Sequence, residues 1–119
     1  MERKEVRDFK DRVPKDLRRA KAQSLMAQHP GKYPLVLVKD SKSRIAFKVS
    51  QYMVNGELTI CNFLYSLRRS INMPKNRGLY LFLSEIMPML NSKIAELYER
   101  FADDDGFLYF SYSDQEDKG

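Results

Sequence analysis

The spacing of apolar residues at the start of the chain predicts two helices that contribute little to the core. Residues 1–28 are rich in lysine and arginine, and their apolar side chains stand far apart. Pro14 is expected to separate a short first helix from a second helix over about 16–28, because proline fits a turn or a helix start. The second helix is expected to stop at His29, Pro30 and Gly31.

Two strands are predicted after this stop. Residues 33–38 are apolar and β-branched, which is typical of a strand, and residues 39–44 are expected to form a loop. Residues 47–54 alternate as a half-buried strand does. The alternation separates the side chains into two faces: Phe47, Val49, Gln51 and Met53 on one, and Lys48, Ser50, Tyr52 and Val54 on the other. The hairpin is expected to end at Asn55 and Gly56.

The second half of the chain predicts two further helices and two further strands. Thr59 fits the N-cap of a helix that runs to about residue 70, with Leu58 and Phe63 as a hydrophobic staple. The inner face of this helix carries apolar residues at helical spacing: Ile60, Leu64, Leu67 and Ile71. The elements expected next are a short strand over 79–83, a helix over 91–101 and a last strand over 107–112. Because the last strand is almost wholly apolar and aromatic, we expect it in the middle of the sheet.

Together these elements predict one α+β domain with a mixed sheet, one crossing helix and two leading helices. The chain has 119 residues, of which 43% are hydrophobic, and this suffices for a single core. We expect neither a signal peptide nor a spanning helix, since charge begins at Glu2 and no apolar run approaches ~18 residues. Cys61 is the only cysteine, so a reducing compartment fits best.

Charge is distributed unevenly along the chain, which matters more than the net charge of +5. Residues 1–48 are strongly basic, whereas residues 101–119 are acidic. A basic front half attracts acidic peptides, anionic lipid headgroups or nucleic acid. The alternative is a solvated helix face without a partner.

Residues that could carry catalysis are scarce, and each has a simpler interpretation. His29 lies at a predicted helix end, where it is expected to cap rather than catalyse. Cys61 lies one residue from the inner face of its helix and is expected to be a small, buried, inert thiol. The run 103–105 of three aspartates lacks the alternating ligands of a calcium loop and is expected to be a solvated turn. The sequence therefore predicts a non-enzyme with no catalytic residue, no cofactor and no metal site.

Gly119 ends a polar stretch that follows the last strand, and this ending suggests a point of covalent attachment. Glycine has no Cβ, so its terminal carbonyl can enter a narrow enzyme cleft. Residues 113–118 are expected to form a flexible arm that reaches roughly 20 Å at ~3.4 Å per residue. The alternative is a polar tail of no special function, since many chains end in this way.

Four blocks of the sequence resemble one protein family. Residues 29–38 (HPGKYPLVLV) are similar to that family's Tyr-Pro-Asp-Arg-Ile/Val-Pro-Val-Ile-Val, and residues 58–63 (LTICNF) to its Leu-Thr-Val-Gly-Gln-Phe. Leu97 and Tyr98 match its Leu-Tyr pair, and residues 107–114 (FLYFSYSD) resemble its Phe-Leu-Tyr-Ile-Ala-Tyr-Ser-Asp. The chain thus resembles, from about Phe9 to the end, the autophagy-related protein eight family of ubiquitin-like modifiers. This family includes the GABA-A-receptor-associated proteins and microtubule-associated protein light chain three.

The resemblance implies a β-grasp (ubiquitin-like) fold with a mixed four-stranded sheet and two additional N-terminal helices. It divides the chain into a helical extension over 1–28, a β-grasp core over 29–113 and a conjugation tail over 114–119. It also implies that an activating and a conjugating enzyme join Gly119 to phosphatidylethanolamine on autophagosomal membrane, and that a cysteine protease removes the lipid. The protein would then be cytoplasmic, and bound to the autophagosome membrane when lipidated.

A peptide-binding surface is expected beside residues 51–54, where an added strand gains backbone hydrogen bonds. By resemblance, cargo receptors insert the two anchors of an aromatic-x-x-aliphatic motif into two pockets. The first pocket takes the aromatic anchor and is formed by Lys21, Leu25, Pro34, Val36, Met53 and Phe107. The second takes the aliphatic anchor and is formed by Tyr52, Val54, Leu58 and Phe63. Lys32 and Lys21 are expected to meet acidic residues beside the motif, and plain core packing is the alternative for each apolar residue.

The chain departs from the family pattern at a few positions. Gln51 stands where lysine is usual, Ser66 where a large apolar residue often closes the second pocket, and Lys118 where an aromatic residue commonly precedes the glycine. Two other functions are therefore considered. One is a soluble peptide-binding adaptor of the same fold that is never conjugated. The other, supported by charge alone, is a basic module that binds nucleic acid or the cytoskeleton.

Overall fold

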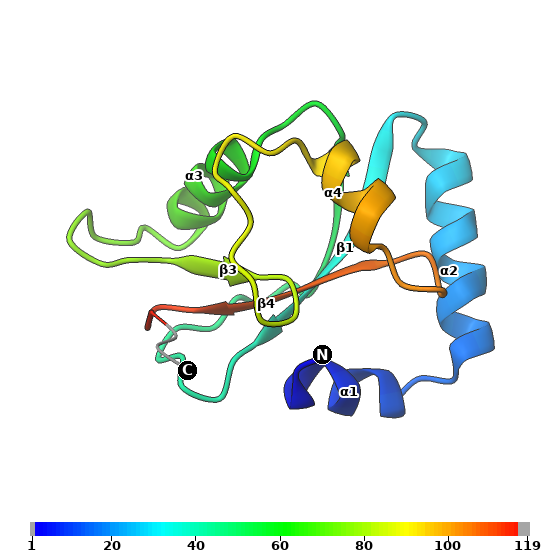
Figure 1. Cartoon of the computed structure of the whole chain (residues 1–119), viewed down its shortest axis with the longest axis horizontal. Coiled ribbons are helices and arrows are strands. Elements are labelled where there is room, and N and C mark those ends of the chain that lie inside the picture. The colour runs from blue at the N-terminus through cyan, green and yellow to red at the C-terminus, as the bar shows by residue number, and fades with distance from the viewer. Residues whose placement is uncertain (1, 117–119) are drawn as a thin grey trace.

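Two helices precede the sheet in the computed structural model, which describes residues 2–116 (Figure 1). Helix α1 spans Lys4–Asp11 and helix α2 spans Lys15–Gln28, with Pro14 at the N-cap of α2. The predicted pair of helices on either side of Pro14 is thereby confirmed. The N-terminal residue Met1 and residues 117–119 lie outside the described part, and so does the predicted attachment point Gly119.

The sheet has four strands in the spatial order β2-β1-β4-β3. Its strands are β1 (Lys32–Lys39), β2 (Gln51–Asn55), β3 (Tyr80–Phe82) and β4 (Leu108–Ser113). The central pair β1 and β4 is parallel, and the two outer pairs are antiparallel. The predicted mixed sheet and the central place of the last strand are both confirmed, and β2 is left at one edge.

Helices α3 (Ile60–Ser70) and α4 (Ile94–Phe101) cover the other face of the sheet from α1 and α2 (Figure 1). Thr59 is the N-cap of α3, as the sequence predicts, and it forms a capping box with Asn62. The Thr59 hydroxyl accepts a hydrogen bond from the Asn62 N–H at 3.2 Å, and Asn62 Oδ1 accepts one from the Thr59 N–H at 3.4 Å. Helix α4 begins three residues later than the sequence suggests. In the described part of the chain, no helix is both long and apolar enough to span a membrane.

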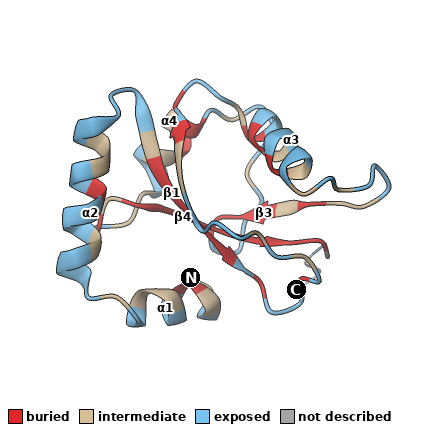
Figure 2. Cartoon of the chain, turned by 180° about the vertical axis from the view of Figure 1, so that it is seen from behind, coloured by how far each residue is buried: buried red, intermediate tan, exposed pale blue. Residues whose placement is uncertain are grey.

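Alternating side chains of the central strands build two cores, one on each face. Leu35 and Leu37 of β1 pack with α3 and α4, whereas Val36 and Val38 pack with α1 and α2. Figure 2 shows the resulting band of buried residues along the central strands. A strand that is buried on both faces has a continuous apolar sequence, which is why β1 and β4 are easy to predict.

The alternation predicted over residues 47–54 is wrong in its first half. Strand β2 begins only at Gln51, and Phe47 packs with Tyr52 and Val54 in the core under α3. Phe47 is held there by Tyr112, since their ring centroids are 4.8 Å apart and the Phe47 N–H donates to the Tyr112 hydroxyl at 2.9 Å. The aromatic contact therefore overrides the period-two pattern.

The expectation of a solvated turn at residues 103–105 is also wrong, because Asp105 is fully buried. Its carboxylate accepts hydrogen bonds from the Phe107 N–H at 2.9 Å, from Arg18 Nε at 2.9 Å and from the Tyr109 hydroxyl. Arg18 also donates to the carbonyls of Lys10 and Val13. Asp105 thus joins the N-terminal helices to the sheet. Burial and the bond to Asp105 raise the pKa of Tyr109 well above its usual range.

Cys61 is exposed, contrary to the prediction of a buried thiol. It lies in the first turn of α3, directly after buried Ile60. The thiol lines an apolar groove of about 460 Å³ between α3 and β3, together with Leu64, Tyr65 and Met87.

Candidate peptide-binding site

The outer edge of β2 has backbone groups that β1 does not use. The Leu37 N–H donates to the Ser50 carbonyl at 2.8 Å, one position beyond the last partners of the antiparallel pair, Val36 and Gln51. Along such a strand, the backbone N–H and C=O groups of one residue bond the neighbouring strand, and those of the next residue point away from it. Tyr52 and Val54 therefore bond β1, while the N–H and C=O groups of Gln51 and Met53 point outward. Among the described residues, no strand pairs with this edge.

A small cavity lies beside this edge on the side of the N-terminal helices, and we call it the α2-side cavity. It encloses about 210 Å³ and is lined by Phe9, Val13, Leu17, Arg18, Lys21, Gln51, Phe107 and Tyr109. Lys21 and Phe107 belong to the first predicted pocket and are brought together here. The apolar residues at positions 9, 13 and 17 come from the two helices and were not predicted to take part, although their four-residue spacing was visible in the sequence.

The other members of the first predicted pocket lie nearby but do not line the α2-side cavity. Val36 is fully buried in the same apolar cluster as Phe107, and Leu25 packs against this cluster. Pro34 and Met53 lie opposite each other on β1 and β2, so they share the face that carries Val36. Pro34 is buried and Met53 is partly exposed. The structure therefore brings only Lys21 and Phe107 of the first predicted pocket into the lining of this cavity.

A second cavity lies between β2 and α3, and we call it the α3-side cavity. It encloses about 440 Å³ and is lined by Ala46, Phe47, Lys48, Val49, Tyr52, Phe63, Ser66, Leu67, Ser70 and Ile71. Of the second predicted pocket it contains Tyr52 and Phe63, whose rings meet edge to face with centroids 5.9 Å apart. Val54 is instead buried in the core, and Leu58 lies outside the cavity. Residues 46–49 were missed because the sequence suggested a regular strand there.

The two cavities lie on opposite faces of one strand, because Gln51 lines the first and Tyr52 lines the second. An extended peptide laid along β2 would also send successive side chains to opposite faces. Side chains one or three positions apart therefore point toward different cavities. With a spacing of three, two anchors lie about 10 Å apart at ~3.4 Å per residue.

Three lysines lie around the outer edge of β2. Lys21 lines the α2-side cavity, Lys48 lines the α3-side cavity, and Lys32 is exposed at the start of β1, opposite Asn55. None of the three makes an ion pair with any residue in the range 2–116. Arg18, in contrast, is committed to Asp105. Burial raises the pKa of the Tyr52 phenol, so the hydroxyl remains a hydrogen-bond donor at neutral pH.

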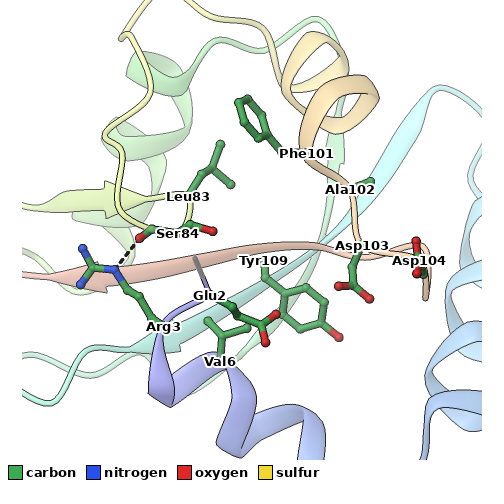
Figure 3. Close-up of a pocket in the computed structure, with 10 residues that line it drawn as sticks. All are labelled: Glu2, Arg3, Val6, Leu83, Ser84, Phe101, Ala102, Asp103, Asp104 and Tyr109. Atoms are coloured by element: carbon green, nitrogen blue, oxygen red, sulfur yellow. Dashed lines mark hydrogen bonds between the residues drawn. The ribbon is translucent and has the colours of Figure 1, made fainter.

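A polar cavity of about 250 Å³ lies away from β2, between α1, the end of β3 and the segment after α4 (Figure 3). Its carboxylates are partly neutralised, since Lys10 pairs with both Glu2 and Asp103. At its far side Arg3 Nε donates to the Ser84 carbonyl at 2.6 Å. This cavity marks the seam where α1 contacts the body of the protein. In the described part of the chain, no group of acidic, histidine or cysteine side chains is arranged to hold a metal ion.

The segment that leads to Gly119 leaves the sheet at Asp114, the last buried residue before the tail. Its carboxylate accepts hydrogen bonds from the Arg44 N–H at 2.9 Å, from Arg44 Nε at 3.3 Å and from Arg77 Nη2. The backbone N–H of Arg44, helped by the Arg77 guanidinium, lowers the pKa of Asp114 to about 2. Asp114 is therefore ionised at any physiological pH.

Comparison with known proteins gives consistent matches. The family model described as "Autophagy protein Atg8 ubiquitin like" matches residues 17–119. Autophagy-related protein 8 of Emericella nidulans is 33% identical over 106 residues, which cover 88% of this chain and 90% of that protein. The same protein of Coccidioides immitis is also 33% identical, over 88% of this chain and 91% of its own length.

A solved structure shows the same fold. The crystal structure of Trypanosoma brucei ATG8 superimposes with a TM-score of 0.83 at 24% sequence identity, over 88% of this chain and 91% of that chain. The predicted ubiquitin-like fold is thereby confirmed.

Proposed function

This chain belongs to the Atg8 family of ubiquitin-like autophagy proteins, and on that basis we propose that it is an autophagy modifier that recruits partners through the edge of β2. The partners would be cargo receptors and adaptors with an aromatic-x-x-aliphatic motif. They would add a strand to β2, with the aromatic anchor in the α2-side cavity and the aliphatic anchor in the α3-side cavity.

One observation carries this proposal: β2, whose outer edge pairs with no strand among residues 2–116, has an apolar cavity on each face. The outward N–H and C=O groups of Gln51 and Met53 supply backbone bonds, and the cavities select side chains. Lys21, Lys32 and Lys48 surround the edge with positive charge, which favours acidic residues beside the motif.

The proposal extends to covalent attachment of Gly119 to phosphatidylethanolamine. An activating enzyme would adenylate the glycine carboxylate with ATP, releasing pyrophosphate, and its cysteine thiolate would then accept the acyl group, releasing AMP. A conjugating enzyme would accept the acyl group on its own cysteine, and the lipid amine would displace that thiolate to form an amide. The family match supports this assignment because it extends through residue 119.

In this proposal the chain itself performs no catalysis. It supplies a glycine carboxylate and a docking surface, while the activating enzyme, the conjugating enzyme and a deconjugating cysteine protease supply the reactive groups. The chain would be cytoplasmic before conjugation and located on the autophagosomal membrane afterwards.

Reconstitution tests both parts of the proposal. The protein is incubated with its activating and conjugating enzymes, ATP and liposomes that contain phosphatidylethanolamine, and the product is identified by mass spectrometry. We expect an amide-linked lipid on wild type and none after deletion of Gly119, with receptor-peptide binding equal in both. Binding of the peptide without any conjugation of wild type would favour a soluble adaptor instead.

A further inference from the structure

The groove between α3 and β3, which we call the α3–β3 groove, has a largely apolar lining. It encloses about 460 Å³, within the roughly 300–1,000 Å³ that is usual for small-molecule sites. The two elements that form it lie side by side in Figure 1. Most of its lining side chains are apolar, among them Leu64, Leu81, Met87 and Leu90. The groove can therefore bury the hydrocarbon part of a ligand.

Part of this apolar lining is open to solvent. Tyr65, Met87 and Leu90 all line the groove and are exposed. The groove uses a different face of α3 from the α3-side cavity, and no residue lines both. A contiguous exposed apolar surface on a small protein marks a site for a ligand or a partner.

Arg68 is the one charged residue among the described residues that line the groove. Its guanidinium is partly buried and is held by two backbone carbonyls, that of Arg77 at 2.5 Å and that of Pro74 at 2.9 Å. Both carbonyls are neutral, and Arg68 makes no ion pair with any residue in the range 2–116. Of the five N–H donors of its guanidinium, three remain for a ligand. A positioned, partly buried cation without a counter-charge suits an anion.

We propose that the α3–β3 groove binds a long-chain fatty acid, with the carboxylate on Arg68 and the hydrocarbon chain along the apolar lining. Along α3 the lining extends from Cys61 to Arg68, about 10 Å at ~1.5 Å per residue. The chain of the fatty acid therefore runs from Arg68 toward Cys61. This inference goes beyond the proposed function and depends on neither conjugation nor peptide binding.

A fatty acid fits this lining better than a peptide does. Each residue of a peptide carries an N–H and a C=O group, and burying these groups without partners is costly. Apart from Arg68, the polar side-chain groups of the lining are the Cys61 thiol and the hydroxyls of Tyr65 and Tyr80. A fatty acid has a single polar end, which matches the single charged group.

Titration with decanoate, a soluble fatty-acid probe, tests the role of the carboxylate. 1-Decanol is the matched ligand, because it has the same chain length and no charge. We expect wild type to bind decanoate at least about tenfold more tightly than decanol, since decanol makes no charge-paired hydrogen bond to Arg68. Arg68→Gln should remove this difference by weakening decanoate binding alone. Equal affinities of wild type for the two ligands would overturn the proposal.

Met87→Asp tests the apolar lining. Met87 is 50% exposed, so this change leaves the core intact while it places a carboxylate in the groove. We expect decanoate affinity to fall at least about tenfold. Met89→Asp is the matched control, because it makes the same change at an exposed methionine of the same segment that does not line the groove. An equal effect of the two changes contradicts the proposal, and Met87→Asp keeps the test decisive if Arg68→Gln disturbs the loop that Arg68 holds.

Cys61 reports where the ligand binds. It is the only cysteine of the chain and it lines the groove, so its alkylation by N-ethylmaleimide, followed by intact mass, gives a single-site signal. We expect saturating decanoate to slow the alkylation several-fold. An aromatic-x-x-aliphatic peptide should leave the rate unchanged, because neither the α2-side nor the α3-side cavity shares a lining residue with the groove. Decanoate that binds while Cys61 reacts at its free rate would also overturn the proposal.

A second copy of the chain is the other occupant that these variants distinguish. Sedimentation velocity compares wild type with Met87→Asp over a range of protein concentrations. A dimer that Met87→Asp abolishes would assign the groove to self-association and contradict a fatty-acid site. Failure of conjugation or of peptide binding would contradict the proposed function alone, since the decanoate measurements require neither.

Discussion

Exposed residues that line the two cavities are the best positions for substitutions that test peptide binding without disturbing the fold. Some cavity residues, such as Phe63 and Phe107, are also buried core residues, and changing them would disturb the fold. Leu17 and Val49 differ, because they line the α2-side and α3-side cavities yet remain 62% and 55% exposed. Their contribution to stability is therefore small.

We predict that Leu17→Asp and Val49→Asp each weaken binding of an aromatic-x-x-aliphatic peptide at least tenfold. Burial of an apolar anchor against such a side chain contributes ~1.5–3 kcal/mol, and ~1.4 kcal/mol corresponds to a factor of ten. Isothermal titration measures the change, and thermal unfolding checks the fold. Met89→Asp, at a position 70% exposed and outside both cavities, is the control and should bind like wild type.

The burial of Asp105 was the structural feature least predictable from the sequence. Three consecutive aspartates before a glycine are typical of a solvated turn, and nothing local distinguishes the middle of this run from its end. The burial of Asp105 depends on Arg18 and Tyr109, which reach it from α2 and β4. A pairing across 87 residues cannot be read from local composition.

We expect Asp105→Asn to lower the free energy of unfolding by about 3 kcal/mol, because it leaves the buried Arg18 guanidinium without its counter-charge. Asp104→Asn, in the adjacent exposed position, should change it by less than ~0.5 kcal/mol. Urea denaturation compares the two variants. Equal effects would show that Asp105 does not join the helices to the sheet.

At the scale of elements, the sequence predicted those helices and strands whose position depends on a single local pattern of residues. Continuous apolar runs predicted β1 and β4, and Thr59 as an N-cap predicted the start of α3. The start of β2 was missed because the aromatic contact between Phe47 and Tyr112 decides it. The same miss removed residues 46–49 from the expected second pocket.

The edge of β2 gives a prediction that depends on backbone geometry alone. Met53→Pro removes an outward N–H that β1 does not use, and edge strands tolerate proline at such positions. We expect peptide affinity to fall about tenfold, because one backbone hydrogen bond to the peptide is lost, and we expect the fold to be retained. Val54→Pro is the counterpart, since it removes an N–H that bonds β1 and should destabilise the sheet. Circular dichroism and peptide titration distinguish the two outcomes.

At the scale of the whole molecule, basic side chains from different elements gather around the edge of β2. The sequence already indicated the basic front half. It could not show that Lys21, Lys32 and Lys48 form no ion pair with any described residue, while Arg18 and Lys10 pair with aspartates of the fold. Which lysines and arginines are available to a partner depends on which of them the fold places beside an aspartate or glutamate.

Lys32 tests this distribution of charge. Because it is exposed at the rim, Lys32→Ala should weaken binding of an acid-flanked peptide about twofold at low salt. At ~0.5 M salt, where charges are screened beyond roughly 4 Å, the variant and wild type should bind equally. Titration at both salt concentrations measures the effect. A loss that persists at high salt would mean that Lys32 contributes by direct packing.

Amide hydrogen exchange of β2, measured by NMR with and without an aromatic-x-x-aliphatic peptide, tests the central claim most directly. In the free protein we expect the outward amides of Gln51 and Met53 to exchange fast, while those of Tyr52 and Val54, bonded to β1, exchange slowly. On binding, the peptide should protect the Met53 amide without changing Tyr52 or Val54. Saturating peptide that binds yet leaves Met53 exchanging at its free rate would contradict strand addition at this edge.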